Sequence, residues 1–546
     1  MTSRADRPVI IIAATPTPNG DLHAGHLAGP YLAADVYARY RRAGGAPVLY
    51  STCTDDSQTY VVSTAHRRDL APGELCEMAT AAIQRSMTSM GISAGFLPPI
   101  DERYRATVLD FVRALHATGR FRRRTVRLPY AERAGRYLVD GLVKGECPVC
   151  LAESCGGSCE GCGHPNHFDQ LINPRSTLDP DDPVGYREAT ILVLPMEEYR
   201  DRLVAHYRQH ADQWRPHSRQ LIEEILARPL PDVPVTVPTG WGVPAPFPET
   251  PGQMLYPWIE AMPASMYSTW CAAREQGIET DAVDELWRAE RGAQLVQFHG
   301  FDNVYFWGMV DLVLLMAHGE RYVLPDANVC NEFYELDNEK FSTSRNHVIG
   351  SDELVRDFPR DLIRFYLALT GPEHQRTNFS RTALRSVTSQ RLVQPWNALA
   401  DRLDLLLRGG DATPLRVSDG GRRRAAAMSQ RFRLCYELPT LSLHRAADVI
   451  VSQLDRLERL SRTVPARADH EGAVADLLLQ VQALLAGAAP ILIDITRAAT
   501  AGGRLTLPAV DDVGWSSERV APIRLPRLSS TAAEDRCADQ LAGVAG

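Results

Sequence analysis

Residues 8–26 read PVIIIAATPTPNGDLHAGH, and this stretch decides the fold class of the chain. The run Val9–Ala14 is apolar throughout, which is typical of a parallel strand that is covered on both faces. A turn of Pro, Asn and Gly follows, and then a helix that should begin near Leu22 and end at Gly44–Gly45. The run Pro47–Cys53 predicts the next strand, so the chain begins with a βαβ unit.

The size and composition of the chain indicate a soluble protein of several domains. Its 546 residues are too many for one core, and 45% hydrophobic and 23% charged residues are ordinary for a globular protein. The net charge of −8 argues against broad, non-specific binding to nucleic acid or membranes. No apolar run reaches the length of a membrane span, and the N-terminus lacks a signal-peptide pattern. We therefore expect a cytoplasmic monomer without membrane or DNA partners.

The sequence pattern changes along the chain and divides it into segments. A cysteine cluster and charged helices interrupt the α/β pattern from about residue 118, and a Pro/Gly-rich stretch near residue 233 marks its return. From about Leu384 onward, apolar residues recur at intervals of three and four, as in a helix bundle. The last segment, residues 511–546, should be loosely packed.

Two histidines stand at the start of the first predicted helix. His23 and His26 share a face of its first turn, where free backbone N–H groups and the positive end of the helix dipole also point. Such a pair can bind anionic oxygens, for example those of a triphosphate. From the spacing alone, a pair of surface histidines fits equally well.

Five of the 11 cysteines lie between Cys147 and Cys162. Cys147-x-x-Cys150 and Cys159-x-x-Cys162 form two tight knuckles, which predict a structural site for a tetrahedral Zn²⁺ ion. Glycines in the knuckles disfavour a redox pair. Three further residues are competing ligands: Cys155, His164 and His167.

Acids follow two of the predicted strands. Asp55 and Asp56 lie at the carboxyl end of the second strand, where open α/β sheets bind ligands, and an acid there can hold an ammonium group. Asp302 follows Gly300 at the end of another predicted strand, where it can accept hydrogen bonds from a ribose. A helix N-cap is the alternative role for each acid.

The stretch EKFSTSR, residues 339–345, contains Lys340, one of only two lysines in the chain. It follows ANVCNEFYELDN, residues 327–338, which has the pattern of a hairpin. A lone cation in a Ser-rich loop can close over phosphates and stabilise charge in a transition state. By itself the stretch fits a solvated lysine better.

Taken together, these motifs resemble those of class I aminoacyl-tRNA synthetases. HAGH, residues 23–26, resembles their HIGH motif, and KFSTS, residues 340–344, resembles their KMSKS loop, in the right order and distance. YSTCTDD, LYPWIEA, HGFDNVYF, EKFSTSRNHVIG and the cysteine insertion narrow the resemblance to the methionyl-tRNA synthetase family. The resemblance covers roughly residues 8–380.

The resemblance implies an α/β fold: a Rossmann-type catalytic domain with a zinc-knuckle insertion and a C-terminal α-helical bundle. It also implies a two-step reaction. The carboxylate of an amino acid attacks the α-phosphate of ATP, which is bound with Mg²⁺, and the acyl group of the adenylate then passes to a tRNA. The implied segments are 1–117 and 233–325 for the catalytic domain, 118–232 for the insertion, 326–383 for the linker with the KMSKS-like loop, 384–510 for the anticodon-binding-like domain and 511–546 for the tail.

The resemblance also implies roles for individual residues. His23 and His26 would stabilise the α-phosphate, Lys340 would bind the β- and γ-phosphates, Asp302 would hold the ribose and Asp56 the ammonium group. Five more residues would line the ATP site: Asn19, Gly20, Gly300, Ser342 and Ser344. Six more would line the amino-acid site: Thr15, Trp258, Ala261, Ser265, Trp307 and Asp311.

The chain departs from the family pattern mainly where specificity is set. Thr343 replaces the second lysine of the KMSKS loop. In the amino-acid pocket, the family's tyrosine, histidine and tryptophan are replaced by Ser265, Trp307 and Asp311. An unpaired Asp is costly to bury beside a thioether, but it suits a cationic or hydroxylated side chain. No tryptophan follows Pro465, where the family usually reads the anticodon.

Three hypotheses follow from the sequence. The first is a methionyl-tRNA synthetase. The second is a repurposed paralogue that activates a different, polar or cationic amino acid and passes it to a small-molecule amine or to a tRNA in a biosynthetic pathway. The third is a catalytically weak tRNA-binding or regulatory protein that keeps the fold.

Overall fold

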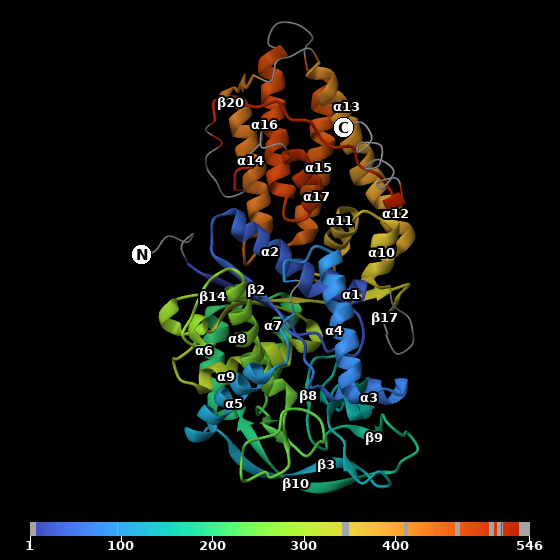
Figure 1. Cartoon of the computed structure of the whole chain (residues 1–546), viewed down its shortest axis with the longest axis vertical. Helices are drawn as coiled ribbons and strands as arrows, with labels where there is room; N and C mark the ends of the chain where they lie inside the picture. The colour runs from blue at the N-terminus through green and yellow to red at the C-terminus, as the bar shows by residue number, and fades with distance from the viewer. Residues whose placement is uncertain are drawn as a thin grey trace.

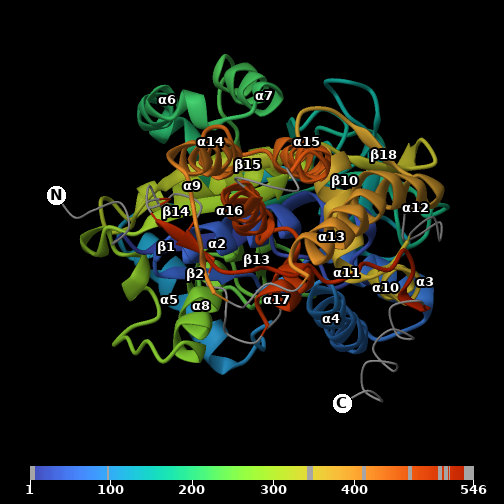
Figure 2. The same cartoon turned by 90° about the horizontal axis from the view of Figure 1, so that it is seen from above.

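The computed structural model describes residues 7–94, 97–340, 349–408, 413–464, 470–501, 507–509, 515 and 517–533. A helical bundle lies at one end of the long axis, the parallel sheet lies in the middle, and the insertion lies at the other end (Figure 1). Seen from above, the bundle helices stand end-on over the sheet (Figure 2).

The central sheet has four parallel strands in the order β15-β14-β1-β2. Ile11 of β1 is paired with Val296 on one side and with Tyr50 on the other. Every residue of β1 is buried, as the continuous apolar run predicts, because helices cover both faces of the sheet. The strands are β1 (Val9–Ala13), β2 (Val48–Ser51), β14 (Gln294–Gly300) and β15 (Pro325–Asn331).

The helix after β1 is kinked, which differs from the single helix that the sequence predicts. It consists of α1 (Ala24–His26), a π-helical turn (Leu27–Tyr31) and α2 (Leu32–Ala43). Gly29 has ψ −119° at the kink, and Pro30 has no N–H to donate. A Cβ atom on Gly29 would lie 2.7 Å from the side chain of Asn331, so the kink depends on contact with β15. The helix ends at Gly44, as predicted.

The other elements of the α/β part of the chain surround the sheet. The hairpin-like pattern of residues 327–338 is partly wrong: β15 joins the parallel sheet, and only β16 and β17 form a hairpin, through Asp337 and Asn338 with positive φ angles. The elements are α3 (Thr59–Arg68), α4 (Pro72–Ser89), α5 (Glu102–Ala117), β12 (Thr236–Val237), β13 (Met254–Leu255), α8 (Pro257–Glu275), α9 (Asp311–Ala317), β16 (Tyr334–Leu336), β17 (Glu339–Lys340), α10 (Ser351–Asp357), α11 (Arg360–Thr370) and β18 (Thr377–Phe379).

The insertion has a sheet of its own with antiparallel strands in the order β11-β10-β3-β4. Two smaller sheets carry the cysteine knuckles, and two helices return the chain to the α/β part. The elements are β3 (Arg122–Ala131), β4 (Arg136–Tyr137), β5 (Val143–Glu146), β6 (Glu153–Cys155), β7 (Gly157–Ser158), β8 (Pro165–Asn166), β9 (Ile172–Ser176), β10 (Val184–Pro195), α6 (Arg200–Gln209), α7 (Pro216–Leu226) and β11 (Asp232–Pro234).

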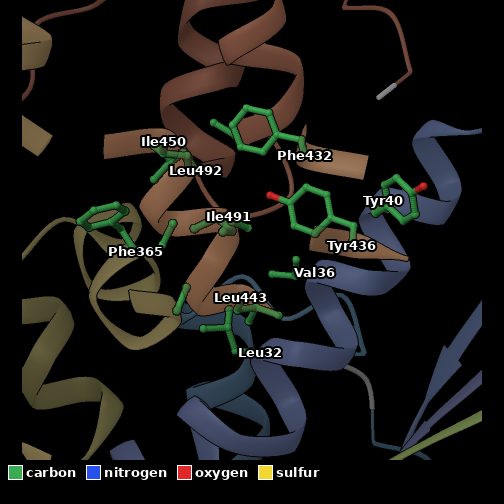
Figure 3. Close-up of a cluster of buried hydrophobic side chains, with 14 of the residues drawn as sticks. Leu32, Val36, Tyr40, Phe365, Phe432, Tyr436, Leu443, Ile450, Ile491 and Leu492 are labelled. Carbon is green, nitrogen blue, oxygen red and sulfur yellow. The ribbon is translucent and has the colours of Figure 1, made fainter. Parts of the chain in front are cut away.

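The bundle packs directly on the α/β part. Leu32, Val36 and Tyr40 of α2 contribute to the same buried cluster as Phe432 and Tyr436 of the bundle (Figure 3). The elements of the bundle are α12 (Arg381–Thr388), α13 (Gln394–Leu406), α14 (Asp419–Tyr436), α15 (Leu443–Arg462), α16 (His470–Ala488), α17 (Ile493–Thr500), β19 (Leu415–Arg416) and β20 (Arg519–Val520).

A buried arginine joins the two parts as well. Arg364 of α11 donates to Asp35 of α2 at 2.7 Å, and both side chains have an exposure of 0%. The same guanidinium donates to the carbonyl oxygens of Met90, Pro490 and Ile491. One side chain therefore holds α2, α11 and the turn between α16 and α17 together.

Two further features concern the C-terminal region. Within the described residues, only α16 has the length and hydropathy of a membrane span, and 72% of that window is buried inside the protein, as in the core helix of a bundle. The described part of the tail differs from the loose packing expected of it: Trp515, Val520, Ile523 and Leu525 are buried in the core.

Candidate functional site

The loops after β1 and β2 meet at the carboxyl edge of the sheet. The N–H of Asp55 donates to the carbonyl oxygen of Pro16 at 3.1 Å, so the loop with the predicted residues Thr15, Asn19 and Gly20 lies beside the Asp55–Asp56 loop. Thr15, Asn19 and Gly20 are half-buried there. This edge is where open parallel sheets bind ligands.

The histidine pair caps α1 with its own rings. Nδ1 of His23 accepts the N–H groups of Gly25 (3.2 Å) and His26 (3.4 Å), and Nδ1 of His26 accepts the N–H of His23 at 3.3 Å. The two rings are stacked, with their centres 3.7 Å apart. Because Nδ1 of each ring is an acceptor, a neutral ring carries its proton on Nε2. The cap therefore fixes both histidines as Nε2–H donors.

The stretch that contains Lys340 returns to this histidine pair. Lys340 ends β17, and its side chain lies outside the described part, as do residues 341–348 with Ser342, Thr343 and Ser344. Where the description resumes, Gly350 forms a β-bridge with His23, and the carbonyl oxygen of Ile349 accepts the N–H of Ala24 at 3.0 Å. The backbone thus joins the HAGH motif to Ile349 and Gly350, more than 300 residues later in the sequence and shortly after the KFSTS stretch.

Asp302 lies in a turn directly after β14. Its Oδ1 accepts a hydrogen bond from the Asn303 amide at 3.1 Å, and its carbonyl oxygen lies 3.4 Å from the hydroxyl of Ser158 in the insertion. A Cβ atom on Gly300 would lie 2.6 Å from Oδ1 of Asp302, so a larger residue at position 300 would displace this carboxylate.

A group of acids lies behind the strand ends, and two of them were missed in the sequence. Burial raises the pKa of Asp55 to about 7, and burial with the nearby Asp55 charge raises the pKa of Glu260 to about 8. Burial also raises the pKa of Asp56 and brings that of Asp140 to about 7. Glu260 in the quoted LYPWIEA and Asp140 before a glycine look like surface residues, and no sequence signal marks them.

Aromatic side chains form one wall of the site. The rings of Trp258 and Phe306 are parallel, with centres 3.6 Å apart. Asp140 accepts hydrogen bonds from Tyr256 (3.1 Å to the hydroxyl) and from Trp258, which orients the wall. On the insertion side of Asp140 lies a small pocket, lined in part by His167.

The remaining predicted amino-acid residues are buried. Ser265 donates its hydroxyl to the carbonyl oxygen of Ala261 at 2.8 Å, within α8. Trp307 lies in the π-helical segment Val304–Val310, and Asp311 begins α9. Asp311 has an exposure of 1%, and neither of its carboxyl oxygens has a hydrogen-bond partner among the described residues.

The four predicted cysteines come together. All four sulfur atoms lie within 4.8 Å of one another, with Cys147 and Cys162 at 3.8 Å and Cys150 and Cys159 at 3.6 Å. A tetrahedral Zn²⁺ ion with bonds of about 2.3 Å needs sulfur separations of about 3.8 Å, so this set fits the ion. Backbone N–H groups of Val149 and Gly161 point at two of the sulfurs.

The competing ligands lie outside this set. His167 donates to or accepts from the Tyr305 hydroxyl at 2.9 Å, and burial lowers its pKa to about 3. His164 contacts the Cys162 carbonyl oxygen and Glu224, and Cys155 interacts with Tyr60. The four-thiolate interpretation of the sequence is therefore the one that the geometry fits.

Comparisons with known proteins agree with this architecture. The family model "tRNA synthetases class I (M)" matches residues 9–404. The methionine–tRNA ligase of Roseiflexus sp. is 31% identical over 438 residues, which are 78% of this chain and 73% of that protein. The ligase of Salinibacter ruber is 34% identical over 386 residues, and that of Chlorobium limicola is 31% identical over 396 residues. These matches span 68% and 70% of this chain, but only 53% and 56% of those two proteins.

The fold comparison extends over almost the whole chain. The structure of Mycobacterium tuberculosis methionyl-tRNA synthetase in complex with methionyl-adenylate has a TM-score of 0.73 at 18% identity. It covers 96% of this chain and 99% of that protein, so the predicted fold class is confirmed. By sequence and by fold, the chain belongs to the methionyl group of the class I tRNA synthetases, which are ligases that form aminoacyl adenylates.

Proposed function

We propose that this protein activates an amino acid with ATP and transfers it to tRNA, in the manner of a methionine–tRNA ligase. The observation that carries the proposal is the backbone bridge between His23 and Gly350, which brings the HIGH-like helix next to the residues that follow the KMSKS-like stretch. The relatives favour tRNA as the acceptor over a small-molecule amine. They also count against a merely tRNA-binding protein.

In the first step, the chain mainly positions and stabilises charge. The amino-acid carboxylate attacks the α-phosphate of MgATP, and the bond to the β-phosphate breaks to release pyrophosphate. The Nε2–H groups of His23 and His26 donate to the α-phosphate oxygens as negative charge builds up. Lys340 binds the leaving phosphates, Asp302 holds the ribose and Asp56 holds the substrate ammonium group.

Other predicted residues complete the two substrate sites. Asn19, Gly20, Gly300, Ser342 and Ser344 contact ATP, and Thr15, Trp258, Ala261 and Trp307 surround the amino acid. In the second step, the terminal ribose hydroxyl of tRNA attacks the carbonyl carbon and AMP leaves. We also propose that the four cysteines hold a structural Zn²⁺ ion and that the protein acts as a cytoplasmic monomer.

The two lysines of the chain allow a matched test. Exchange of radiolabelled pyrophosphate into ATP measures adenylate formation, and charging of bulk tRNA with methionine measures transfer. Lys340→Ala should lower exchange about 10²- to 10³-fold, as the loss of one transition-state contact does. Lys144→Ala should have no effect, because Lys144 forms an exposed ion pair with Glu153 in the insertion. The absence of exchange with every amino acid would refute the proposed function.

A further inference from the structure

Carboxyl groups from three separate elements converge behind the carboxyl edge of the sheet. Asp55 and Asp56 follow β2, Glu260 lies on α8 and Asp311 begins α9. The charge of Asp55 acts on both Glu260 and Asp311, so these groups are neighbours. Glu260 and Asp311 are almost fully buried.

Unsatisfied acceptors accumulate in this cluster. Both carboxyl oxygens of Asp311, Oε1 of Glu260 and Oδ1 of Asp56 are buried without a hydrogen-bond partner in the described part of the protein. The amide oxygen of Gln297 on β14 is also buried without a partner among the described residues, and its Nε2 contacts the sulfur of Met262 on α8. Buried polar atoms normally have partners, so a group of unpaired acceptors indicates that a donor-bearing ligand is missing.

Among the described residues, the groups that act on these acids include no cation. The neighbours that act on the pKa values of Asp311, Asp55 and Glu260 are other acids, hydroxyl groups and the amide of Gln58. Glu260 is partly satisfied, because Ser57 and Tyr104 donate to its Oε2 at 3.0 and 3.2 Å. Asp311 has no donor on either oxygen, although it is the most deeply buried of the four acids.

One ammonium group cannot satisfy all of these acceptors. In the proposed function, the α-ammonium group of the amino acid is held by Asp56, after β2. Asp311 lies on a different element, one helical turn beyond Trp307, and offers two further oxygens. A thioether has no N–H or O–H group to donate to them, whereas an amino, guanidinium or hydroxyl group does.

We propose that Asp311 determines specificity and receives a hydrogen-bond donor, preferably cationic, at the end of the substrate side chain. This inference rests on the proposed function. It assigns the side chain that the site prefers and leaves the reaction and the tRNA acceptor unchanged.

The test compares amino acids by pyrophosphate exchange on the full chain. The probes are methionine, its apolar analogue norleucine, and the donor-bearing ornithine, lysine, arginine and homoserine. We expect kcat/KM for at least one donor-bearing probe to exceed that for methionine at least 10-fold. In Asp311→Leu, exchange with that probe should fall at least 100-fold, and the ratio of methionine to that probe should rise.

Two further variants make the result decisive. Asp311→Asn keeps the shape of the side chain and folds without a buried carboxyl, so it should lower exchange with a cationic probe more than with methionine. Glu260→Gln changes a neighbouring buried carboxyl, one oxygen of which two hydroxyl groups already hold, so it should change the ranking of the amino acids less than either Asp311 variant does.

The outcomes separate the inference from the proposed function. If methionine is the best substrate and neither Asp311 variant changes the ranking, the role of Asp311 is refuted while the proposed function stands. If no amino acid supports exchange, the proposed function is refuted, and the inference with it.

Discussion

His23 offers a test in which the cap of α1 is separated from phosphate binding. Its Nδ1 accepts two backbone N–H groups, and its Nε2–H is the proposed donor to the α-phosphate. In His23→Asn, the side-chain oxygen reaches the place of Nδ1, and asparagine is a good N-cap. No atom reaches the place of Nε2. In His23→Gln the amide reaches that place, but the cap is weakened, and in His23→Ala both are lost.

The magnitudes follow from these two roles. Loss of an N-cap costs about 0.5–2 kcal/mol of stability, so His23→Ala and His23→Gln should be less stable than the parent by this amount. His23→Asn should stay within about 0.5 kcal/mol. Loss of one donor to a transition state costs about 2.7–4 kcal/mol, so pyrophosphate exchange should fall about 10²- to 10³-fold in both His23→Asn and His23→Ala. His23→Gln should retain more activity than either.

Urea unfolding gives the stability and pyrophosphate exchange gives the rate. Stability and activity should therefore not fall together. His23→Asn should be as stable as the parent but much slower, whereas His23→Gln should be less stable but faster than His23→Asn. If His23→Asn keeps more than about a tenth of the parent rate, Nε2 of His23 does not bind the α-phosphate, and the reasoning from the cap is wrong.

Three other predictions test the ion pair, the metal site and the acids. Arg364→Leu should cost about 3–5 kcal/mol in urea unfolding, because buried Asp35 keeps only Arg39 as an ion-pair partner and three carbonyl oxygens lose their donor; a loss below about 1 kcal/mol would contradict this. Metal analysis should find about one zinc per chain, and Cys159→Ser or a strong chelator should remove it and lower the melting temperature; a full four-sulfur set without zinc would contradict the site. Asp55 and Glu260 have pKa values raised to about 7 and 8, so the native state binds more protons than the unfolded chain above about pH 4, and stability should fall as the pH rises to about 8. Over the same range KM for the amino acid should decrease, because the ionised acids attract its ammonium group, and a flat profile between pH 6 and 8 would refute this.

Local patterns predict much of this molecule because short-range physics determines them. The apolar run Val9–Ala13 needs no partner to be identified as a buried strand, and the spacing of Cys147 and Cys150 already dictates a knuckle. The histidine pair could also be predicted from the sequence, because positions three apart share one face of a helix.

Features that depend on distant residues were not predictable in the same way. The kink at Gly29 requires the side chain of Asn331 against it, and β15 was mistaken for half of a hairpin because its true partner, β14, lies in a separate stretch. Glu260 and Asp140 belong to the site only because the fold brings them to the ends of distant strands. No pattern around either residue carries that information.

The shared cluster of Leu32, Val36, Tyr40, Phe432 and Tyr436 has a consequence for dissecting the enzyme (Figure 3). A truncation before the bundle would expose the apolar face of α2 to water and leave the helix with the histidine pair without its support. The bundle is therefore not an interchangeable module. A chimera with a foreign helical bundle should work only if α2 and α11 are exchanged together with it.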